Sequence, residues 1–379
     1  MSSALRGCES APTELYDVAL LDLDGVVYVG PDAVPGASDS LAAARERGMR
    51  LAFVTNNAAR PPHEVADHLS DLGVAARPDE VVTSAQAAAR HLGDRLPGGA
   101  RVLVVGTTGL TEALRERGLV PVDDAHGQVD AVVEGYSPEL TWALFAEGAV
   151  AINRGVPWVA TNVDRTIPSA RGPLPGNGAF VAAMQLATGR EPVITGKPDP
   201  TMHRESVLRS GAERPIVVGD RLDTDIEGAN AAGCDSLLVF TGVTTPGELL
   251  EAPERLRPTY LAADLAGLLT AHPQPERDGD AYRCGRWSAV VEGDTLRLTA
   301  DGDQAGDRNA QAMDALRAMC AAWWARRDAV DGGKRPIDSR ADTPEASDSQ
   351  VKGQRVHGPR LRADGEAASE ALRMLHLAD

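Results

Sequence analysis

The sequence predicts an α/β protein whose core is a parallel β-sheet with helices on both faces. From residue 15 onward, short apolar runs rich in β-branched residues alternate with amphipathic stretches that end in glycine. This alternation is typical of a parallel sheet, because each strand needs a crossover connection before the next can run in the same direction. The strand candidates are apolar throughout, which is typical of a sheet covered on both sides.

The elements can be assigned in chain order. The strand candidates share a short apolar run and span 18–21, 51–54, 102–105, 131–133, 158–160, 193–195, 216–218 and 237–240. Helical stretches between them begin with a Ser or Asp cap and end at Gly48, Gly155 and Gly211, because glycine readily adopts the left-handed conformation that ends a helix. This order predicts a Rossmann-like parallel-sheet core.

The segment after Tyr260 has a different pattern. Residues 282–300 alternate polar and apolar side chains across a Glu-Gly-Asp turn, which predicts a hairpin. The following helix places Met313, Leu316, Cys320 and Trp323 on one face, and we interpret this face as core. Residues 331–358 contain no Leu or aromatic residue and are predicted to be a flexible insert. We therefore expect 276–379 to form a small α+β appendage.

Bulk composition excludes several classes of protein. A net charge of −17 argues against a nucleic-acid surface or an anionic membrane as partner. No apolar stretch approaches the roughly 20 residues of a membrane span, and the N-terminus has no signal-peptide pattern. The four cysteines form no Cys-x-x-Cys pair, so we expect reduced thiols in a cytoplasmic protein.

Four of the apolar runs are each followed at once by residues able to do chemistry. These are Asp22 and Asp24; Thr55, Asn56 and Asn57; Gly196 and Lys197; and Gly219, Asp220, Asp223 and Asp225. The strands of a parallel sheet end at one common edge, and in open α/β sheets ligands bind there. We therefore expect these four segments, distant in the chain, to converge on one crevice.

The residue types in this crevice predict a magnesium and phosphate site. Crowded carboxylates need a cation, and hard oxygen ligands without histidine favour magnesium over zinc. Lys197 is the only lysine in the first 333 residues, which indicates that a compact ammonium is needed at this position. Magnesium together with Lys197 would form an anion pocket, whose usual occupant is phosphate.

Each motif taken alone has another interpretation. "DLDG" could begin a calcium loop, although the third acid and later Glu of that loop are missing. "GKP" is not a P-loop, because Glu191 and Pro198 stand where its first Gly and its Ser or Thr should be. For Asp223 we prefer an N-cap of the following helix. The order of the motifs at four strand ends is what favours a common site.

On these residues the sequence resembles the haloacid dehalogenase superfamily. "DLDG", "VTNN", "GKP" and "GDRLDTDI" match its four motifs in order, and the resemblance covers residues 15 to 270. The chain is similar to the branch with a large α/β cap between the second and third motifs, which includes p-nitrophenyl, phosphoglycolate, nucleotide and sugar phosphatases. "VVGDRLDTDIEGANAAG" and the closing "LRADGEAASEAL" most resemble bacterial glycerol-3-phosphate phosphatases, whose tail has been likened to part of an acetyltransferase fold. The tail of this chain shows no Gly-rich pyrophosphate loop, so acetyl transfer is not expected.

The resemblance implies a division into three domains. A catalytic core would comprise 12–84 and 171–272, an inserted α/β cap 85–170, and the appendage 276–379. The cap would close over the sheet edge, exclude water and recognise the organic part of the substrate. "TNVDRTIP" corresponds to a substrate-specificity loop in related caps, and the residues carried over are Asn162, Asp164, Arg165 and Ile167.

The same resemblance implies the roles of the two acids after the first strand. Asp22 would be the nucleophile that forms an aspartyl-phosphate. Asp24 would protonate the leaving alkoxide and then activate the hydrolytic water, and its backbone carbonyl would bind magnesium. Asp22 and Asp220 would supply the carboxylate ligands of the metal.

The remaining motif residues would act on the phosphate. Thr55 and Asn56 would hold phosphoryl oxygens by hydroxyl and amide bonds, and Lys197 would neutralise charge on the phosphate and on Asp22. Asp225 would orient Lys197 or a metal-bound water.

We therefore expect a magnesium-dependent phosphomonoesterase acting on a small phosphorylated metabolite, with sn-glycerol 3-phosphate as first candidate. The alternatives are a phosphoglycolate, sugar or nucleotide phosphatase, then a phosphomutase or a non-catalytic sensor of phosphometabolites. Related enzymes often dimerise through the cap, so a homodimer is considered as well.

Overall fold

The computed structural model describes residues 5–167, 171–302, 307–331 and 358–378. The chain divides into two compact units. The larger comprises Cys8–Thr244 and Glu254–His272, and the smaller comprises Met1–Gly7, Thr245–Pro253 and Pro273–Asp379. Apart from its two end residues, the expected insert 331–358 lies outside the described residues.

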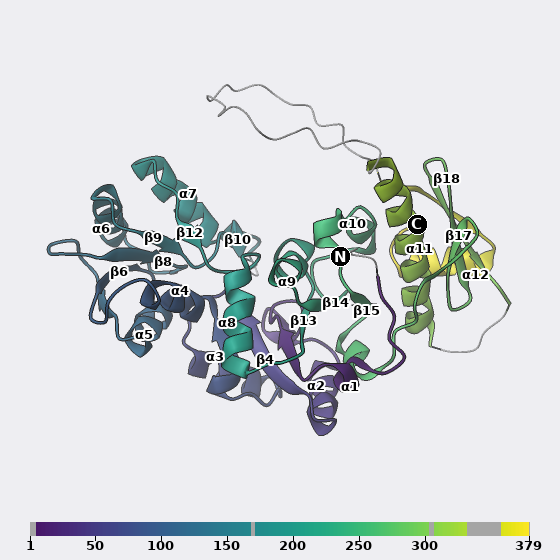
Figure 1. Cartoon of the computed structure of the whole chain (residues 1–379), viewed down its shortest axis with the longest axis horizontal. Helices are drawn as coiled ribbons and strands as arrows, with labels where there is room; N and C mark the ends of the chain where they lie inside the picture. The colour runs from purple at the N-terminus through teal and green to yellow at the C-terminus, as the bar shows by residue number, and fades with distance from the viewer. Residues whose placement is uncertain (1–4, 168–170, 303–306, 332–357, 379) are drawn as a thin grey trace, which may run out of the picture. The chain divides into compact units, whose positions relative to one another are not determined.

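The main sheet of the larger unit has six strands in the order β15-β14-β13-β1-β4-β5, all of them parallel (Figure 1). Their bounds are Tyr260–Ala262, Asp235–Val239, Pro215–Gly219, Val18–Leu21, Arg50–Thr55 and Val81–Thr83. The predicted parallel-sheet core is thereby confirmed. β1 lies between β13 and β4 in the interior of the sheet, so the residues that follow these three strands face the crevice at its carboxyl edge.

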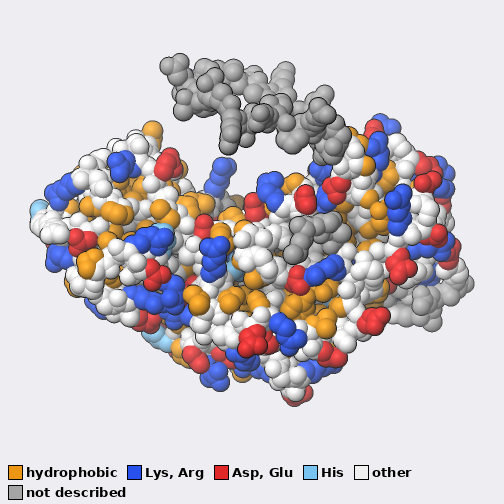
Figure 2. Space-filling view, viewed as in Figure 1, with side chains coloured by type: hydrophobic (Ala, Val, Ile, Leu, Met, Phe, Trp, Pro, Cys, Tyr) orange, Lys and Arg blue, Asp and Glu red, His pale blue; other side chains and the backbone are white. Residues whose placement is uncertain are grey.

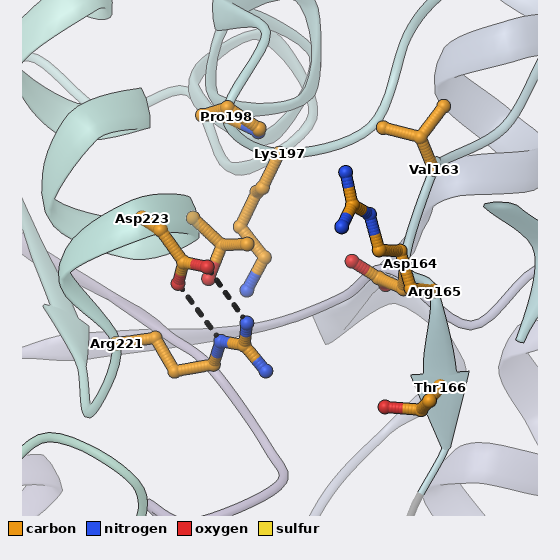
Figure 3. Close-up of a pocket in the computed structure, with 9 residues that line it drawn as sticks. Val163, Asp164, Arg165, Thr166, Lys197, Pro198, Arg221 and Asp223 are labelled. Atoms are coloured by element: carbon orange, nitrogen blue, oxygen red, sulfur yellow. Dashed lines mark hydrogen bonds and ion pairs between the residues drawn. The ribbon is translucent and has the colours of Figure 1, made fainter. Parts of the chain in front are cut away.

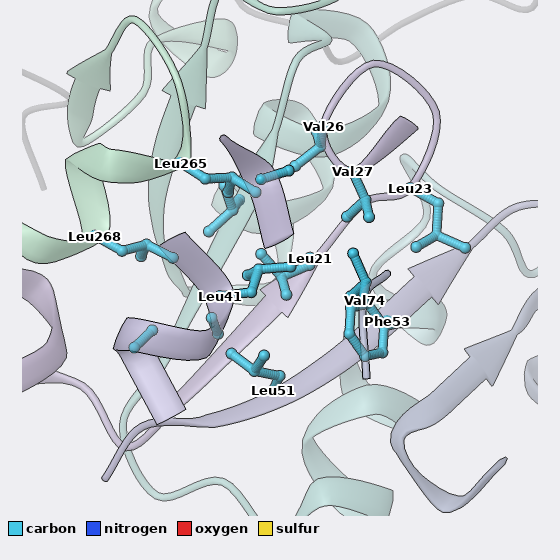
Figure 4. Close-up of a cluster of buried hydrophobic side chains, with 14 of the residues drawn as sticks. Leu21, Leu23, Val26, Val27, Leu41, Leu51, Phe53, Val74, Leu265 and Leu268 are labelled. Carbon is cyan, nitrogen blue, oxygen red and sulfur yellow. The ribbon is translucent and has the colours of Figure 1, made fainter. Parts of the chain in front are cut away.

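Both faces of this sheet are buried, as the continuous apolar strands predict. Alternate strand residues enter two separate clusters, of which Figure 4 shows the one that includes Leu21 and Phe53. The helices that contribute to that cluster are α2 (Ala37–Glu46) and α3 (Pro62–Asp71). The opposite cluster takes residues from α4, α8 and α9, which span Ser84–Gly93, Pro200–Ser210 and Glu227–Ala232.

A second parallel sheet of five strands lies in the same unit, in the order β12-β9-β8-β6-β7. Its strands span Val193–Ile194, Trp158–Ala160, Ala131–Glu134, Arg101–Val105 and Val120–Val122. The helices packed on it beside α4 are α5 (Thr108–Glu116), α6 (Trp142–Asn153) and α7 (Asn177–Thr188). This sheet with its helices forms the cap.

The sequence interpretation of 193–195 as a main-sheet strand is wrong. β12 pairs with β9 of the second sheet, and only two of its residues are in the ladder. A strand this short has no pattern of its own that could assign it to one sheet. The expected end of the cap at residue 170 is not tested by this pairing. Because β12 belongs to the second sheet, we propose that the cap extends to Ile194.

The smaller unit contains a five-stranded sheet in the order β16-β17-β18-β19-β20, with strands Glu276–Asp278, Ala281–Cys284, Trp287–Glu292, Thr295–Ala300 and Arg360–Asp364. β18 and β19 form the predicted hairpin, while β20 joins in parallel. Helix α11 (Arg308–Asp331) buries the predicted face of Met313, Leu316, Cys320 and Trp323. The remaining helices are α10 (Pro246–Leu250) and α12 (Glu366–Met374), and α1 (Pro12–Leu15) belongs to the larger unit.

Within the described residues, every helix is too short or too polar to cross a membrane.

Candidate active site

Asp22 stands at the carboxyl end of β1 because the ladder continues one residue past the strand. Its N–H donates to Val218 O at 2.8 Å, which fixes the direction of the side chain at the sheet edge. The chain then turns through Gly25, whose φ of 85° is one that residues with a Cβ rarely adopt. The turn keeps Asp22 and Asp24 at the same edge.

Lys197 reaches Asp22 from the cap sheet. Gly196 links β12 to the lysine, and a Cβ at this glycine would overlap the backbone oxygen of Thr161, so the close approach requires glycine. The Lys197 ammonium donates to Asp22 Oδ1 at 2.5 Å and to Asp225 Oδ1 at 2.7 Å. The side chain is 3% exposed, so both contacts are shielded from water.

The electrostatics of this group follow from its burial. Burial alone would lower the pKa of Lys197, but the carboxylates of Asp22 and Asp225 outweigh it and raise the pKa. The ammonium therefore stays charged. Burial raises the pKa of Asp22, while the ammonium of Lys197 works in the opposite direction. The lysine thus favours the charged form of the carboxylate beside it.

Asp220 follows β13 and offers an oxygen to a cation. Its Oδ2 accepts from Val243 N at 2.6 Å, whereas its buried Oδ1 has no hydrogen-bond partner in the described part of the chain. Burial raises its pKa to about 6. An unpartnered buried carboxylate oxygen is unfavourable unless a cation or a proton satisfies it.

The residues present fit a hard divalent cation. Asp22, Asp220 and Asp225 each place one oxygen within 4.8 Å of the others, and oxygen donors suit Mg²⁺. Both oxygens of Asp225 are already used, by Lys197 and by Arg221 N. Asp225 therefore fits a supporting position better than a direct ligand position, whereas Asp22 and Asp220 can turn an oxygen to the ion.

Asp24 is separate from this carboxylate group. Its residue is exposed, although partial desolvation of the carboxyl raises its pKa against the opposing effect of Lys197. A carboxyl with a raised pKa that opens to solvent can hold and release a proton near the reacting atoms. Its side chain is outside the metal-sized group formed by the described acids.

Thr55 and Asn56 end β4 beside Lys197. Thr55 is buried and its hydroxyl accepts from Asn57 N at 3.1 Å. The Asn56 amide donates to Lys197 O and to Asp164 Oδ2, and its Oδ1 accepts from Lys197 N. Because these contacts occupy the Asn56 side chain, a phosphate would meet the main chain of this residue and the hydroxyl of Thr55.

The cap loop contacts the same strand end. Asn162 Nδ2 donates to Asn56 O at 2.8 Å. Two of the four predicted loop residues, Asn162 and Asp164, therefore form hydrogen bonds with Asn56. Arg165 lines the cavity beside Lys197. Ile167 lies in the short strand β10 (Thr166–Ile167) and is not among the described residues that line the cavity.

The cavity has a volume of about 310 Å³. Its lining comes from the cap loop and from two core segments: Val163, Asp164, Arg165, Thr166, Lys197, Pro198, Arg221, Asp223 and Thr224 (Figure 3). Sequence reasoning did not assign Arg221 or Thr224 to a site. The N-cap interpretation of Asp223 is wrong, because Asp223 lies inside the π-helix Leu222–Ile226 and its carboxylate pairs with Arg221, the residue before that helix.

The comparisons agree with this geometry. A family model described as haloacid dehalogenase-like hydrolase matches residues 19–120, and a second, HAD-hydrolase-like model matches 194–268. The D-glycerol 3-phosphate phosphatase of Mycobacterium tuberculosis is 44% identical over 329 residues, which cover 85% of this chain and 89% of that protein. The chain belongs to the haloacid dehalogenase-like hydrolases. Its relatives are named phosphatases, and this hydrolase is a phosphoric monoester phosphatase.

Other relatives show how much of the chain is similar to known phosphatases. The acid sugar phosphatase of Staphylococcus saprophyticus is 37% identical and covers 66% of this chain and 95% of its own. The crystal structure of the M. tuberculosis glycerol phosphate phosphatase with magnesium has a TM-score of 0.80 at 39% identity and covers 97% of this chain and 99% of its own. The p-nitrophenyl phosphatase of Archaeoglobus fulgidus has a TM-score of 0.62 at 32% identity and covers 67% and 98%. Residues 284–346 match a GCN5-related N-acetyltransferase-like model.

Proposed function

We propose that this hydrolase removes phosphate from a small phosphorylated metabolite, with sn-glycerol 3-phosphate as its first substrate and Mg²⁺ as its cofactor. The carrying observation is the buried ammonium of Lys197 between Asp22 and Asp225, next to the unpartnered oxygen of Asp220. The name of the M. tuberculosis relative supports the choice of substrate.

In the proposed reaction Asp22 attacks phosphorus and forms an aspartyl-phosphate. Its contact with Lys197 holds the carboxylate in one orientation at the sheet edge. Asp24 gives its proton to the leaving alkoxide, which matches a carboxyl with a raised pKa that opens to solvent. The deprotonated Asp24 then takes a proton from the water that hydrolyses the acyl-phosphate.

Charge on the transferred phosphoryl group is balanced from two sides. Lys197 supplies a fixed ammonium and Thr55 a hydroxyl. Asp22, Asp220 and the backbone carbonyl of Asp24 would hold the magnesium ion, with Asp225 in support. When bound, the ion would neutralise phosphoryl oxygens and so lower the repulsion that Asp22 meets on attack.

The test is phosphate release with and without Mg²⁺ from glycerol 3-phosphate, phosphoglycolate, sugar phosphates, nucleotides and p-nitrophenyl phosphate. We expect turnover that chelation abolishes, and Asp22→Asn should reduce it by at least about 1,000-fold because the amide cannot act as nucleophile. The preferred compound decides between glycerol 3-phosphate and the alternative metabolites. A folded protein that binds Mg²⁺ but turns over none of them would favour a mutase or a sensor.

We also propose that two copies associate through the cap. Helices α6 and α7 pack together, and their outer faces are apolar, with Trp142 83% exposed and Leu186 90% exposed. Exposed apolar surface of this kind marks a protein interface. Light scattering tests this, because Leu186→Glu should halve the mass of a dimer. A wild-type protein that scatters as a monomer would contradict it.

We propose a cytoplasmic location, supported by four cysteines that form no disulfide within the described residues. Cell fractionation tests this, since the protein should follow a cytoplasmic marker.

A further inference from the structure

The cavity beside Lys197 is lined mostly by hydrogen-bonding side chains. Among its described lining residues, Val163 and Pro198 alone lack a polar side-chain group, and none is aromatic. A nucleobase would therefore find no ring to stack on. Thr166 and Thr224 can both donate and accept a hydrogen bond. This lining suits a ligand that is itself rich in hydroxyl groups.

The charges in the lining balance. The ammonium of Lys197 is already paired with Asp22 and Asp225. Beyond it, the guanidinium groups of Arg165 and Arg221 are matched in number by the carboxylates of Asp164 and Asp223. The wall away from the phosphate position thus has no surplus positive charge for a second anionic group such as a carboxylate.

Arg221 and Asp223 form an ion pair with two hydrogen bonds on the core side of the cavity (Figure 3). Arg221 Nε donates to Asp223 Oδ1 at 3.0 Å, and Nη2 donates to Oδ2 at 2.9 Å. This bidentate geometry fixes the guanidinium plane. It uses two of the five guanidinium N–H groups and one lone pair on each carboxylate oxygen. The side chains are 41% and 63% exposed, so a ligand can reach the donors and acceptors that remain.

We propose that the Arg221–Asp223 pair determines substrate specificity by binding hydroxyl groups of the organic part, so that the enzyme selects phosphate monoesters of small polyols. Asp223 accepts a hydrogen bond from one hydroxyl, and Arg221 donates to the neighbouring one. The inference rests on the proposed phosphatase function and adds a recognition element contributed by the core, opposite the cap loop.

The experiment compares glycerol 3-phosphate with n-propyl phosphate, which has the same carbon chain and no hydroxyl. For the wild type we expect a ratio of kcat/KM values of about 10 or more in favour of glycerol 3-phosphate, because the analogue leaves charged hydrogen-bonding groups unpaired. Asp223→Ala should reduce this ratio at least about tenfold, mainly through a higher KM for glycerol 3-phosphate. Arg221→Gln should reduce it in the same direction.

The chain offers a matched control in Arg77 and Asp79, which have the same spacing and also pair through Nε and Nη2. Asp79→Ala should leave the ratio unchanged. An equal ratio in wild type and Asp223→Ala would overturn the inference, as would a wild type without preference for glycerol 3-phosphate. In both cases magnesium-dependent turnover of p-nitrophenyl phosphate by the wild type shows that the proposed phosphatase function itself still holds. Absence of that turnover would instead refute the proposed function.

Discussion

At the scale of single residues, the absence of a side chain shapes the metal site as much as the carboxylates do. A Cβ at Gly242 would overlap the Asp220 carboxylate, and the φ of Gly242 lies outside the left-handed range. The same Cβ would lie 2.8 Å from the Cα of Gly25, so Gly242→Ala should displace Asp220 together with the turn at Gly25. We expect the Mg²⁺ concentration for half-maximal activity to rise at least about tenfold, as for residues that position metal ligands.

Gly98→Ala is the control for that substitution, because a Cβ at Gly98 meets no atom within 4 Å. A Gly242→Ala enzyme whose Mg²⁺ dependence matches that of Gly98→Ala would contradict the assigned role of the glycine. This requirement has no signal in the sequence, since the carboxylate that needs the space belongs to the preceding strand-to-helix turn.

Glu134 is a second residue whose environment predicts a measurable effect. Its side chain is buried in the cap, Oε2 accepts from Trp158 Nε1 at 3.1 Å, and Oε1 has no partner among the described residues. Burial raises its pKa to about 8. The folded protein therefore holds a proton that the unfolded chain has lost above the ordinary glutamate pKa of 4.5.

The free energy of unfolding should consequently fall as pH rises from 4.5 towards 8, by at most about 1.4 kcal/mol per pH unit from this group. Glu134→Gln removes the titration, so its urea midpoint should depend less on pH across this window. Parallel pH profiles of wild type and Glu134→Gln would show that Glu134 is charged in the fold.

The site residues also show how far sequence reasoning reaches. Asp22, Asp220 and Lys197 could be singled out because unpaired charges directly after apolar runs are costly unless they meet at a site. Asp223 stands out in the same way, but its pairing with Arg221 could not be predicted, because an acid at that spacing equally suits a helix N-cap. Only the geometry of the turn shows that the carboxylate faces Arg221 instead.

At the scale of elements, the alternation of strands and helices is sufficient to predict a parallel sheet. The residues of a single strand do not show which of the two sheets that strand joins. Strand β12 has two paired residues, so its partner is chosen by the packing of α7 and β9 and not by its own sequence. For the same reason the boundaries of the cap were harder to predict than its presence.

Three elements are joined by one buried carboxylate. Glu205 of α8 is fully buried and pairs with Arg90 of α4, with Arg117 at the end of α5 at 3.3 Å and with Arg209 at 2.6 Å. Glu205→Gln should lower the free energy of unfolding by about 3 kcal/mol, because it leaves Arg90 and Arg117 without their counter-charge and Arg209 with Glu116 alone. Urea denaturation measures this.

Glu116→Gln is the matched control, because Glu116 pairs with Arg209 at 3.5 Å and is 52% exposed. A surface pair of this kind contributes about 0–1 kcal/mol. Equal losses in the two variants would show that the network around Glu205 does not join the elements.

At the scale of the whole molecule, the net charge of −17 opposes an anionic substrate. Acidic and basic side chains are interspersed on the face shown in Figure 2. The KM for glycerol 3-phosphate should fall modestly when ionic strength rises from about 10 mM to about 150 mM, because the screening length shortens from about 30 Å to about 8 Å. The assay keeps free Mg²⁺ constant, and an unchanged or higher KM would contradict the prediction.

The short path from β12 through Gly196 to Lys197 limits how the cap can swing. Two residues separate the last cap strand from the ammonium that holds Asp22, so a hinge placed elsewhere would pull the lysine out of the site with every opening. The pivot must lie close to Thr195 and Gly196, and the opposite rim of the cap must sweep the widest arc. We propose that a cap opening in this way would admit substrate at that far rim and leave the contact between Lys197 and Asp22 in place.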